Sequence, residues 1–573
     1  MRARAWRLPM LLLIPVLLVV GLTIEGHSDG ATPGAAAAPV DGLAAVAPAE
    51  GSLGSTWYCP AGSATGDPAG IAEQVVVIAN LSDQPIEVAF TAYVGVLATD
   101  PAREQGAPVA LVVPVPANGR VPVRVSDVVK APWASVLVEV QGGRVVVEQV
   151  LTGPQGRTVA QCASRPSSTW YFPAGTTRAG TSEYIALFNP FPDEASVDIT
   201  FETEEGARTP EAFRGLIVPG SSTSVVPIGA VTDAAIGAAL KRQVATTVVA
   251  RNGRIVAEQL LVSDGTPTEF EDPVTGAVDP GLTSVGLAAT VGAPAPGTTW
   301  VFPAVTAPAD GVTASISVMN PTDRDTEVEV QVFLDQPELN GSVEPFVLSI
   351  PRGRYETKAL FDGRIPPGVG GWALVQSTDG VPVVAQLLEE GIGSAEPGIA
   401  TVMGSPVVAS DWVLAAASIA DLEGTSLSIV NPAAVGEVRV RLVGRSQGVE
   451  VAIPGGEIVV LAGTRVPIDM AIDGRAIDEL ILEVVGDAPI VVSRRFVFGA
   501  ADDIAVTLGL PVAGTLRAPV DLARPVAVEP DPPVTEGSDV TQPTAGDGGT
   551  APDDSASTTT ASTTPTTTAT TTG

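Results

Sequence analysis

The chain has 573 residues, with 64 acidic and 31 basic side chains and a formal net charge of −33. This charge excludes a nucleic-acid-binding protein whose affinity rests on a basic surface, because such a surface must displace counterions from phosphates. An acidic excess is typical of a protein kept soluble by self-repulsion outside the cell. The length suits several domains of about 100–150 residues each.

Residues 1–24 form a targeting segment. Three arginines precede an apolar stretch from Leu8 to Ile24, which is the arrangement of an export signal. The stretch is close to the roughly 20 apolar residues that span a bilayer, so a cleaved signal peptide and an uncleaved membrane anchor both remain open. Either one exports the rest of the chain. Residues 25–54, rich in Gly, Ala and Pro, are predicted to be a disordered spacer.

Four landmarks then recur four times in the same order. Each copy opens with a Trp and continues with an apolar run ending in Asn, a turn containing Pro and Gly, and a β-hairpin pattern. The tryptophans are Trp57, Trp170, Trp300 and Trp412, and the asparagines are Asn80, Asn189, Asn320 and Asn431. Residues shared by all copies are expected to be scaffold rather than chemistry.

The repeats predict four modules with flexible segments around them. The modules are residues 55–165, 166–265, 298–392 and 393–515, with a linker, either a hinge or an extra edge element, at 266–297. A propeller is disfavoured because its blades are about 40–50 residues long and these units are about twice that length. Separate modules arranged like beads on a string are therefore predicted. Residues 516–573 form a disordered, Ser/Thr/Pro-rich tail, either O-glycosylated or unmodified.

Each module is predicted to be a β-sandwich. In the second copy, Val197, Ile199 and Phe201 alternate with polar residues, which places one face of a strand in the core and the other in water. Turn pairs such as Asn252-Gly253 accept the positive φ angles of tight hairpins. The predicted fold class is all-β, with tandem immunoglobulin-like antiparallel sandwiches, an N-terminal hydrophobic helix and a disordered C-terminal tail.

The two cysteines bracket the first module. Cys59 lies at its opening and Cys162 just past its last strand. An even count in an exported protein favours a disulfide. The bond would close a loop of about 100 residues and stabilise the fold by about 4–5 kcal/mol in the chain-entropy account.

Residue types that carry catalysis are scarce. His27 is the sole histidine and lies in the spacer, which excludes Ser-His-Asp chemistry and His-containing zinc sites from the modules. Neighbouring acidic residues, such as Glu204-Glu205, Glu389-Glu390 and Asp502-Asp503, are interpreted as solvated loop charges. Asp323-Arg324-Asp325 lacks the spacing of a calcium loop. No catalytic, cofactor-binding or metal-ligating residue is predicted.

Trp133 and Trp372 are less regular than the four opening tryptophans. They are the better candidates for exposed ligand contacts, for example by stacking on sugars, although packing in a core is favoured for them too. The opening tryptophans are expected to fill a sandwich end or a module junction.

The copies resemble a bacterial extracellular sandwich repeat. The resemblance rests on Trp170-Tyr171-Phe172-Pro173-Ala174-Gly175, Leu187-Phe188-Asn189-Pro190, Val218-Pro219-Gly220 and Ile255-Val256-Ala257-Glu258-Gln259. Over about residues 55–515 the chain is similar to an uncharacterised family of exported actinobacterial proteins, classed as a domain of unknown function. The fourth copy departs from the pattern at Trp412-Val413-Leu414. The resemblance implies export but carries no activity.

We expect a non-enzymatic cell-envelope protein, a spacer or interaction scaffold that is extracytoplasmic and either membrane-anchored or secreted. The alternative is a cell-wall glycan-binding protein, and a carboxylate-dependent glycosidase is a third and weaker hypothesis. The expected partners are envelope proteins or cell-wall glycans, and the membrane if the N-terminal segment is uncleaved. No nucleic acid and no cofactor are expected.

Overall fold

A computed structural model describes residues 42–524 with internal gaps. The gaps are residues 67–69, 101–105, 179, 204–205, 229–242, 267–269, 272–277, 280–283, 306–311, 337–338, 340–342, 361–364, 366–367, 392–396, 416–421, 447, 452, 454–455, 471–479 and 500–502. The predicted targeting segment, most of the predicted spacer and most of the predicted tail lie outside the described residues. In the described ranges no helix is long and apolar enough to cross a membrane.

The described chain is all-β, as predicted, and each repeat contributes two sheets. We call them the peripheral and the axial sheet. In module 1 the peripheral order is β1 (Gly54–Cys59), β6 (Trp133–Gln141), β3 (Ile86–Leu97) and β4 (Val109–Val115). The axial order is β5 (Gly119–Arg124), β2 (Glu73–Asn80), β7 (Val145–Gly153) and β8 (Gly156–Gln161).

Modules 2 and 3 repeat this order. The peripheral strands are β9 (Thr169–Gly175), β15 (Val244–Asn252), β11 (Ala195–Thr203), β12 (Gly206–Arg208) and β13 (Leu216–Val218), then β20 (Thr299–Val305), β25 (Gly371–Ser377), β22 (Thr326–Leu334) and β23 (Phe346–Ile350). The axial strands are β14 (Ser222–Pro227), β10 (Thr181–Asn189), β16 (Val256–Asp264) and β19 (Val285–Val291), then β24 (Arg354–Ala359), β21 (Val312–Asn320), β26 (Val384–Gly391) and β27 (Gly398–Met403).

Module 4 uses one long strand, β34 (Ile481–Phe498), in both of its sheets. Its other peripheral strands are β28 (Val408–Ala415), β30 (Glu437–Ser446), β31 (Val449–Val451), β32 (Glu457–Leu461), β36 (Leu510–Pro511) and β37 (Leu516–Arg517). Its other axial strands are β33 (Thr464–Asp469), β29 (Leu422–Asn431) and β35 (Ile504–Leu508). Two 3₁₀ turns, η2 (Val125–Asp127) and η3 (Glu211–Phe213), and a small hairpin of β17 (Phe270–Glu271) and β18 (Val278–Asp279) complete the description.

The opening Trp of every copy joins the two sheets of its own module. The four indole N–H groups donate to the carbonyls of Val145, Ile255, Val383 and Ile490 at 2.8–3.1 Å. Each Trp is at most 2% exposed. A buried indole needs such a partner because an unpaired N–H is costly in a core. The recurring Trp is therefore scaffold, as predicted.

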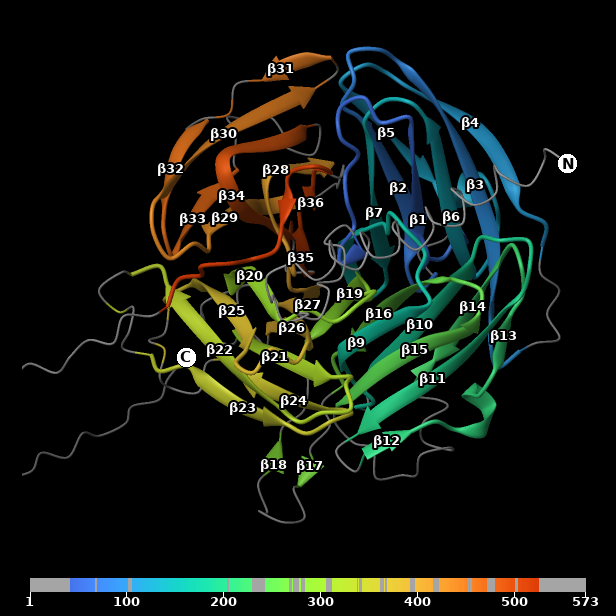
Figure 1. The fold of residues 1–573 in the computed structure, drawn as a ribbon. Helices are drawn as coiled ribbons and strands as arrows, with labels where there is room; N and C mark the ends of the chain where they lie inside the picture. The colour runs from blue at the N-terminus through green and yellow to red at the C-terminus, as the bar shows by residue number, and fades with distance from the viewer. Residues whose placement is uncertain are drawn as a thin grey trace, which may run out of the picture. The chain divides into compact units, whose positions relative to one another are not determined.

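The four modules follow one another around a common axis (Figure 1). One apolar core contains Trp170, Trp300 and Trp412 from modules 2, 3 and 4, and β3 of module 1 pairs in parallel with β14 of module 2. Between the ends of the ring, Ala47 N donates to Pro511 O at 2.9 Å and Ala513 N to Ala47 O at 2.8 Å. The prediction of separate beads is therefore wrong, because it considered each module alone and not the apolar faces between modules.

Several predicted boundaries shift once strand pairing is known. β19 pairs with β16, so residues 285–291 of the predicted linker are an edge strand of module 2. β27 pairs with β26, so residues 398–403 belong to module 3 rather than module 4. In module 2 the last strand, β19, begins 21 residues after β16 ends at Asp264, and composition marks this long connection more clearly than it marks the strand.

Cys59 and Cys162 form the predicted disulfide, with a sequence separation of 103. We expect the double change Cys59→Ala and Cys162→Ala to lower the free energy of unfolding by about 4–5 kcal/mol, because the unfolded chain regains the entropy of a long open loop. Urea unfolding of the oxidised wild type and of the variant measures this difference. A loss below about 1 kcal/mol would show that the loop-entropy account does not apply here.

Candidate functional site

Buried carboxylates with displaced pKa values are the usual markers of an active site. Burial raises the pKa of Glu183 to about 8 and that of Glu258 also to about 8, although a Gln side chain and a main-chain N–H oppose the shift at each. Burial also raises the pKa of Glu148, against the attraction of Arg494. All three glutamates lie beside module junctions.

Glu258 joins module 2 to module 1. Its Oε2 accepts the N–H of Ala61 at 2.9 Å, and its Oε1 accepts Gln149 Nε2 at 2.6 Å. Gln149 Oε1 in turn accepts Gln74 Nε2 at 2.6 Å. Ala61 belongs to the Trp-aromatic-x-Pro-Ala-Gly landmark, so this part of the repeat serves the junction.

The next junction uses the same positions with different side chains. Gln386 of module 3 accepts the N–H of Ala174 at 2.9 Å and donates to Gln259 Oε1 at 2.8 Å. Gln259 Nε2 then donates to Glu183 Oε1 at 2.8 Å. Gln386 thus takes the place of Glu258, and Glu183 takes the place of Gln74.

An ion pair closes the ring between modules 4 and 1. Arg494 Nη2 donates to Glu148 Oε2 at 2.9 Å, with side chains 3% and 0% exposed. Arg494 lies four residues after Ile490, whose carbonyl accepts the Trp412 indole, and so matches the position of Gln149. At the remaining junction, between modules 3 and 4, Arg495 pairs with Glu389 at 3.6 Å.

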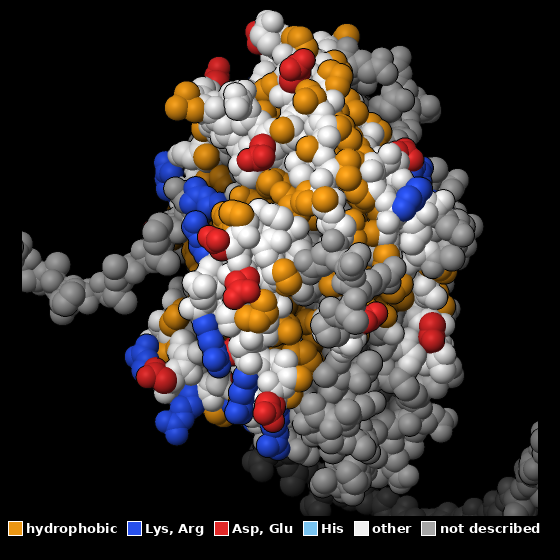
Figure 2. All heavy atoms as spheres, turned by 90° about the vertical axis from the view of Figure 1, so that its right-hand side faces the viewer, with side chains coloured by type: hydrophobic (Ala, Val, Ile, Leu, Met, Phe, Trp, Pro, Cys, Tyr) orange, Lys and Arg blue, Asp and Glu red, His pale blue; other side chains and the backbone are white. Residues whose placement is uncertain are grey.

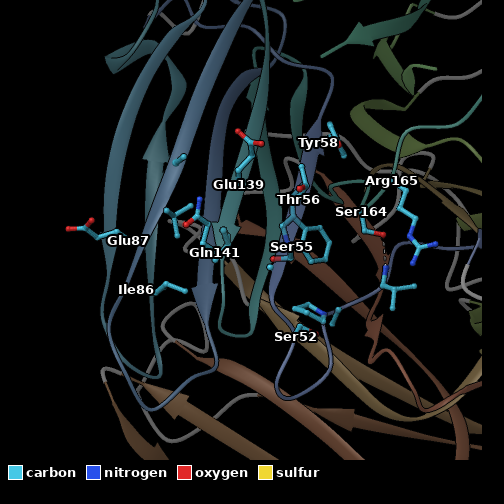
Figure 3. A pocket seen from close by; sticks show the side chains of 18 of the residues that line it. Ser52, Ser55, Thr56, Tyr58, Ile86, Glu87, Glu139, Gln141, Ser164 and Arg165 are labelled. Atoms are coloured by element: carbon cyan, nitrogen blue, oxygen red, sulfur yellow. Dashed lines mark hydrogen bonds between the residues drawn. The ribbon is translucent and has the colours of Figure 1, made fainter. Parts of the chain in front are cut away.

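A groove of about 1060 Å³ lies on the peripheral sheet of module 1 (Figure 3). Its floor contains the cross-strand pairs Thr56 with Glu139 and Gly54 with Gln141. One wall is the segment Ser164–Pro166, whose Ser164 Oγ accepts the N–H of Val46 at 3.1 Å. None of the junction glutamates lines this groove, so their displaced pKa values accompany a structural role.

The groove presents polar side chains that have few partners within the described chain. Glu87, Glu139 and Gln141 are exposed and lie on the same side of the sheet as Tyr58 (Figure 3). Burial raises the pKa of the Tyr58 hydroxyl, and the negative charge of Glu139 raises it further. Arg165 adds a positive charge at the wall. Such a surface suits a polar ligand that offers hydroxyl or amine donors.

Apolar side chains extend the groove towards β4. Val112 is 61% exposed and lines the groove, and Val109 on the same strand is 41% exposed. Figure 2 shows the face on the right of Figure 1, where apolar side chains gather over the middle of the surface and charged ones are scattered around them. A ligand here would meet both polar and apolar surface.

A second cavity, of about 280 Å³, lies at the ends of the axial strands. It is lined by Gln161, Val291, Met403 and Leu508 from the four strand ends, and the segment Gly42–Ala45 borders it. The side chain of Gln161 donates there to Leu508 O at 2.6 Å and to Gly509 O at 2.9 Å. This cavity contains no pair of groups with catalytic geometry.

Trp133 and Trp372, the predicted exposed contacts, are buried at module junctions. Trp133 is 3% exposed and packs on Tyr184 of module 2 with ring centroids 5.1 Å apart. Trp372 is 1% exposed, stacks on Phe333 at 4.1 Å and donates to Gly463 O of module 4 at 3.1 Å. The favoured interpretation, packing in a core, is confirmed, and the alternative of exposed ligand contacts is wrong, because packing between modules covers both rings.

The acidic pairs were interpreted as solvated, and for two of their members this is wrong. Asp503 is 1% exposed and Glu389 is 0% exposed. Glu204, Glu205 and Asp502 lie outside the described residues.

The sequence does not single out the groove residues, because polar residues that alternate along a strand give the same pattern whether they line a groove or an open face. Among the residues placed by the structure, no three His, Cys, Asp or Glu side chains gather as metal ligands would.

A model of a family of unknown function (DUF5719) matches residues 35–266 and residues 147–471. These matches cover more than half of the chain, so the chain belongs to this family. No curated protein matches it. A solved structure of Thermotoga maritima 1070 is 20% identical in sequence to this chain, with a TM-score of 0.16. The alignment covers 19% of this chain and 93% of the Thermotoga maritima chain.

Glu258→Gln should remove part of the pH dependence of stability. The folded state keeps a proton on Glu258 up to a pKa of about 8, against 4.5 for the free group, so stability falls as pH rises between these values. The wild type should lose about 1.4 kcal/mol per pH unit more than the variant. Gln is expected to fit at position 258 because Gln386 occupies the matching place at the next junction. If the Gln149 amide flips, its Oε1 can accept from the new Gln side chain, and its Nε2 can donate to Gln74 Oε1, which is buried and unpaired in the described structure.

Urea unfolding at pH 5.5 and 7.5 measures this difference. Glu457→Gln, a change at an exposed carboxyl, is the control and should leave the slope as in the wild type. Equal slopes in all three proteins would contradict a displaced pKa at Glu258.

Glu148→Gln or Arg494→Gln alone should destabilise the ring by about 3–5 kcal/mol, because each leaves a buried charge unpaired. The double variant should recover most of this loss, since it reproduces the Gln259 and Gln386 pair of another junction. A double-mutant cycle in urea measures the coupling. Additive losses would show that the two side chains do not act as a pair.

Proposed function

We propose that the protein is a non-enzymatic, exported cell-envelope protein that acts as an interaction scaffold and binds its partner in the groove of module 1. The observation that carries the proposal is the 1060 Å³ groove whose exposed Glu87, Glu139 and Gln141 side chains face a possible ligand. In this proposal the modules are immunoglobulin-like sandwiches, and residues 1–24 act as a signal peptide or a membrane anchor.

Rigidity beside the groove supports a binding role. The disulfide joins Cys59 of β1 to Cys162, which lies two residues before the groove wall Ser164–Pro166. Tyr58 and Ala163 exchange two main-chain hydrogen bonds of 2.8 Å beside it. A wall held in place before binding loses less entropy when a ligand arrives. A disulfide also persists best in an oxidising compartment, in agreement with export.

Packing between modules favours a scaffold over an extended spacer. A spacer gains length from modules that contact little, whereas here Trp372 of module 3 donates to module 4 and Arg494 of module 4 pairs with module 1. The ring holds one module in a fixed relation to the other three. In a binding protein this packing would fix the orientation of the groove relative to modules 2, 3 and 4.

A cell-wall glycan is the second candidate ligand. The lining of hydroxyl, amide and carboxylate groups, with the Tyr58 ring beside them, matches the many donors and acceptors of a sugar chain. An envelope protein would instead use the exposed apolar residues of β4 together with the polar groove.

The test is binding to purified cell wall and, separately, to detergent-extracted envelope proteins. The double variant Glu139→Gln with Gln141→Ala should bind at least about tenfold more weakly, because one lost hydrogen bond to a charged group costs about 1.5–3 kcal/mol. Glu327→Gln, an exposed carboxyl on β22 of module 3, is the matched control and should bind like the wild type.

Retention on cell wall alone would favour the glycan ligand, and retention of a defined protein would favour the scaffold. No loss of binding in the groove variant would contradict the groove as the site. Release of sugars by the wild type, abolished by Glu139→Gln, would contradict a non-enzymatic protein.

A further inference from the structure

The four axial sheets end at the centre of the ring with edge strands. β8, β19, β27 and β35 are the last strands of their sheets. An edge strand leaves a row of main-chain N–H and C=O groups without a ladder partner. In a buried place each such group must find another partner, because an unpaired one costs free energy.

Asp503, directly before β35, supplies such a partner to one main-chain N–H of each module. Its Oδ2 accepts the N–H of Arg157 at 3.0 Å and that of Leu287 at 2.7 Å. Its Oδ1 accepts the N–H of Ile399 at 2.9 Å and that of Ile504 at 2.8 Å. The four donors lie on β8, β19, β27 and β35, so one carboxylate receives one N–H from each module.

Asp503 occupies a position that is Gly in the other three modules. The donors Arg157, Leu287 and Ile399 directly follow Gly156, Gly286 and Gly398, as Ile504 follows Asp503. A Cβ atom added at Gly286 would lie 2.9 Å from Asp503 Oδ1, and added Cβ atoms at the other two glycines would overlap the same carboxylate. The glycines of modules 1, 2 and 3 therefore leave space for the carboxylate of Asp503 from module 4.

The four main-chain N–H groups around Asp503 have the arrangement of an anion-binding site. Convergent main-chain N–H groups form anion-binding concavities in many proteins, and hydrogen bonds from such groups favour the ionised carboxylate. Burial nevertheless raises the pKa of Asp503, against the four N–H groups. Neither described cavity includes the side chain, which is 1% exposed.

We propose that this end of the axis is a carboxylate-binding site built from one main-chain N–H of each module. Asp503 is its resident ligand, and a free small carboxylate occupies the site when that side chain is removed. The inference does not depend on the function proposed for the groove. It assigns to Asp503 the joining of the last axial strands of all four modules.

Chemical rescue of stability tests the proposal. Asp503→Ala should lower the Tm, and formate should restore part of the loss, because Ala keeps the Cβ and formate replaces the missing carboxylate. For one site the ratio of folded to unfolded protein rises by the factor 1 + [L]/Kd, so formate at about nine times its Kd raises this ratio about tenfold. The gain in the free energy of unfolding depends on the logarithm of this factor. The Asp503→Gly variant also lacks the Cβ, so acetate, whose methyl group replaces it, should raise the Tm of this variant more than formate does.

Sodium chloride at equal ionic strength should give no such gain. The wild type and Asp487→Ala serve as controls, because Asp487 also accepts a main-chain N–H, that of Arg439 at 2.8 Å, but at an exposed position of β34. Equal effects of formate on Asp503→Ala and on both controls, or no effect on any, would overturn the proposal.

If Asp503→Ala does not fold in plain buffer, the variant is refolded from urea with and without formate. Recovery of the native near-ultraviolet circular dichroism in formate alone supports the site. A variant that stays unfolded in formate, and in acetate for Asp503→Gly, overturns it.

Discussion

The fold depends on how the inner edges of its sheets are satisfied. Each module alone would expose a row of main-chain groups on its last axial strand, and the ring brings four such rows together in its interior. Asp503 at one end of the strands and Gln161 at the other supply side-chain partners there. Without Asp503, one main-chain N–H of each central edge strand would lose this partner in a buried place, which costs free energy that a marginally stable domain has little of.

The junctions show how one scaffold position takes different chemistry. Gln149 with Glu258, and Gln259 with Gln386, are nearly neutral pairs within the run of modules, whereas Arg494 with Glu148 is an ion pair where the last module meets the first. A buried ion pair adds little net stability, but a wrong partner leaves a buried charge unpaired. We infer that the ion pair specifies which two modules close the ring.

The sequence predicts the properties that each copy repeats. Strand alternation, the role of the Trp residues and the Cys59–Cys162 bond follow from local pattern, compartment and counting. The ring does not follow, because its contacts join residues such as Glu148 and Arg494, which are 346 positions apart. Asp503 was misread because two adjacent acids look like a surface loop. Comparing the starts of the last strands, where Gly156, Gly286 and Gly398 correspond to Asp503, is the signal that would have found it.

The carboxylate on the axis also bears on how many modules such a ring can have. An ionised carboxylate has two oxygens with about four acceptor positions, and all four are used here, one by each module. A fifth module inserted into the chain would bring a fifth N–H to a group with no acceptor left, and a ring of three would leave one acceptor empty. The valence of a single side chain thus matches the copy number of the repeat, so gain or loss of a whole copy is penalised at the centre of the molecule.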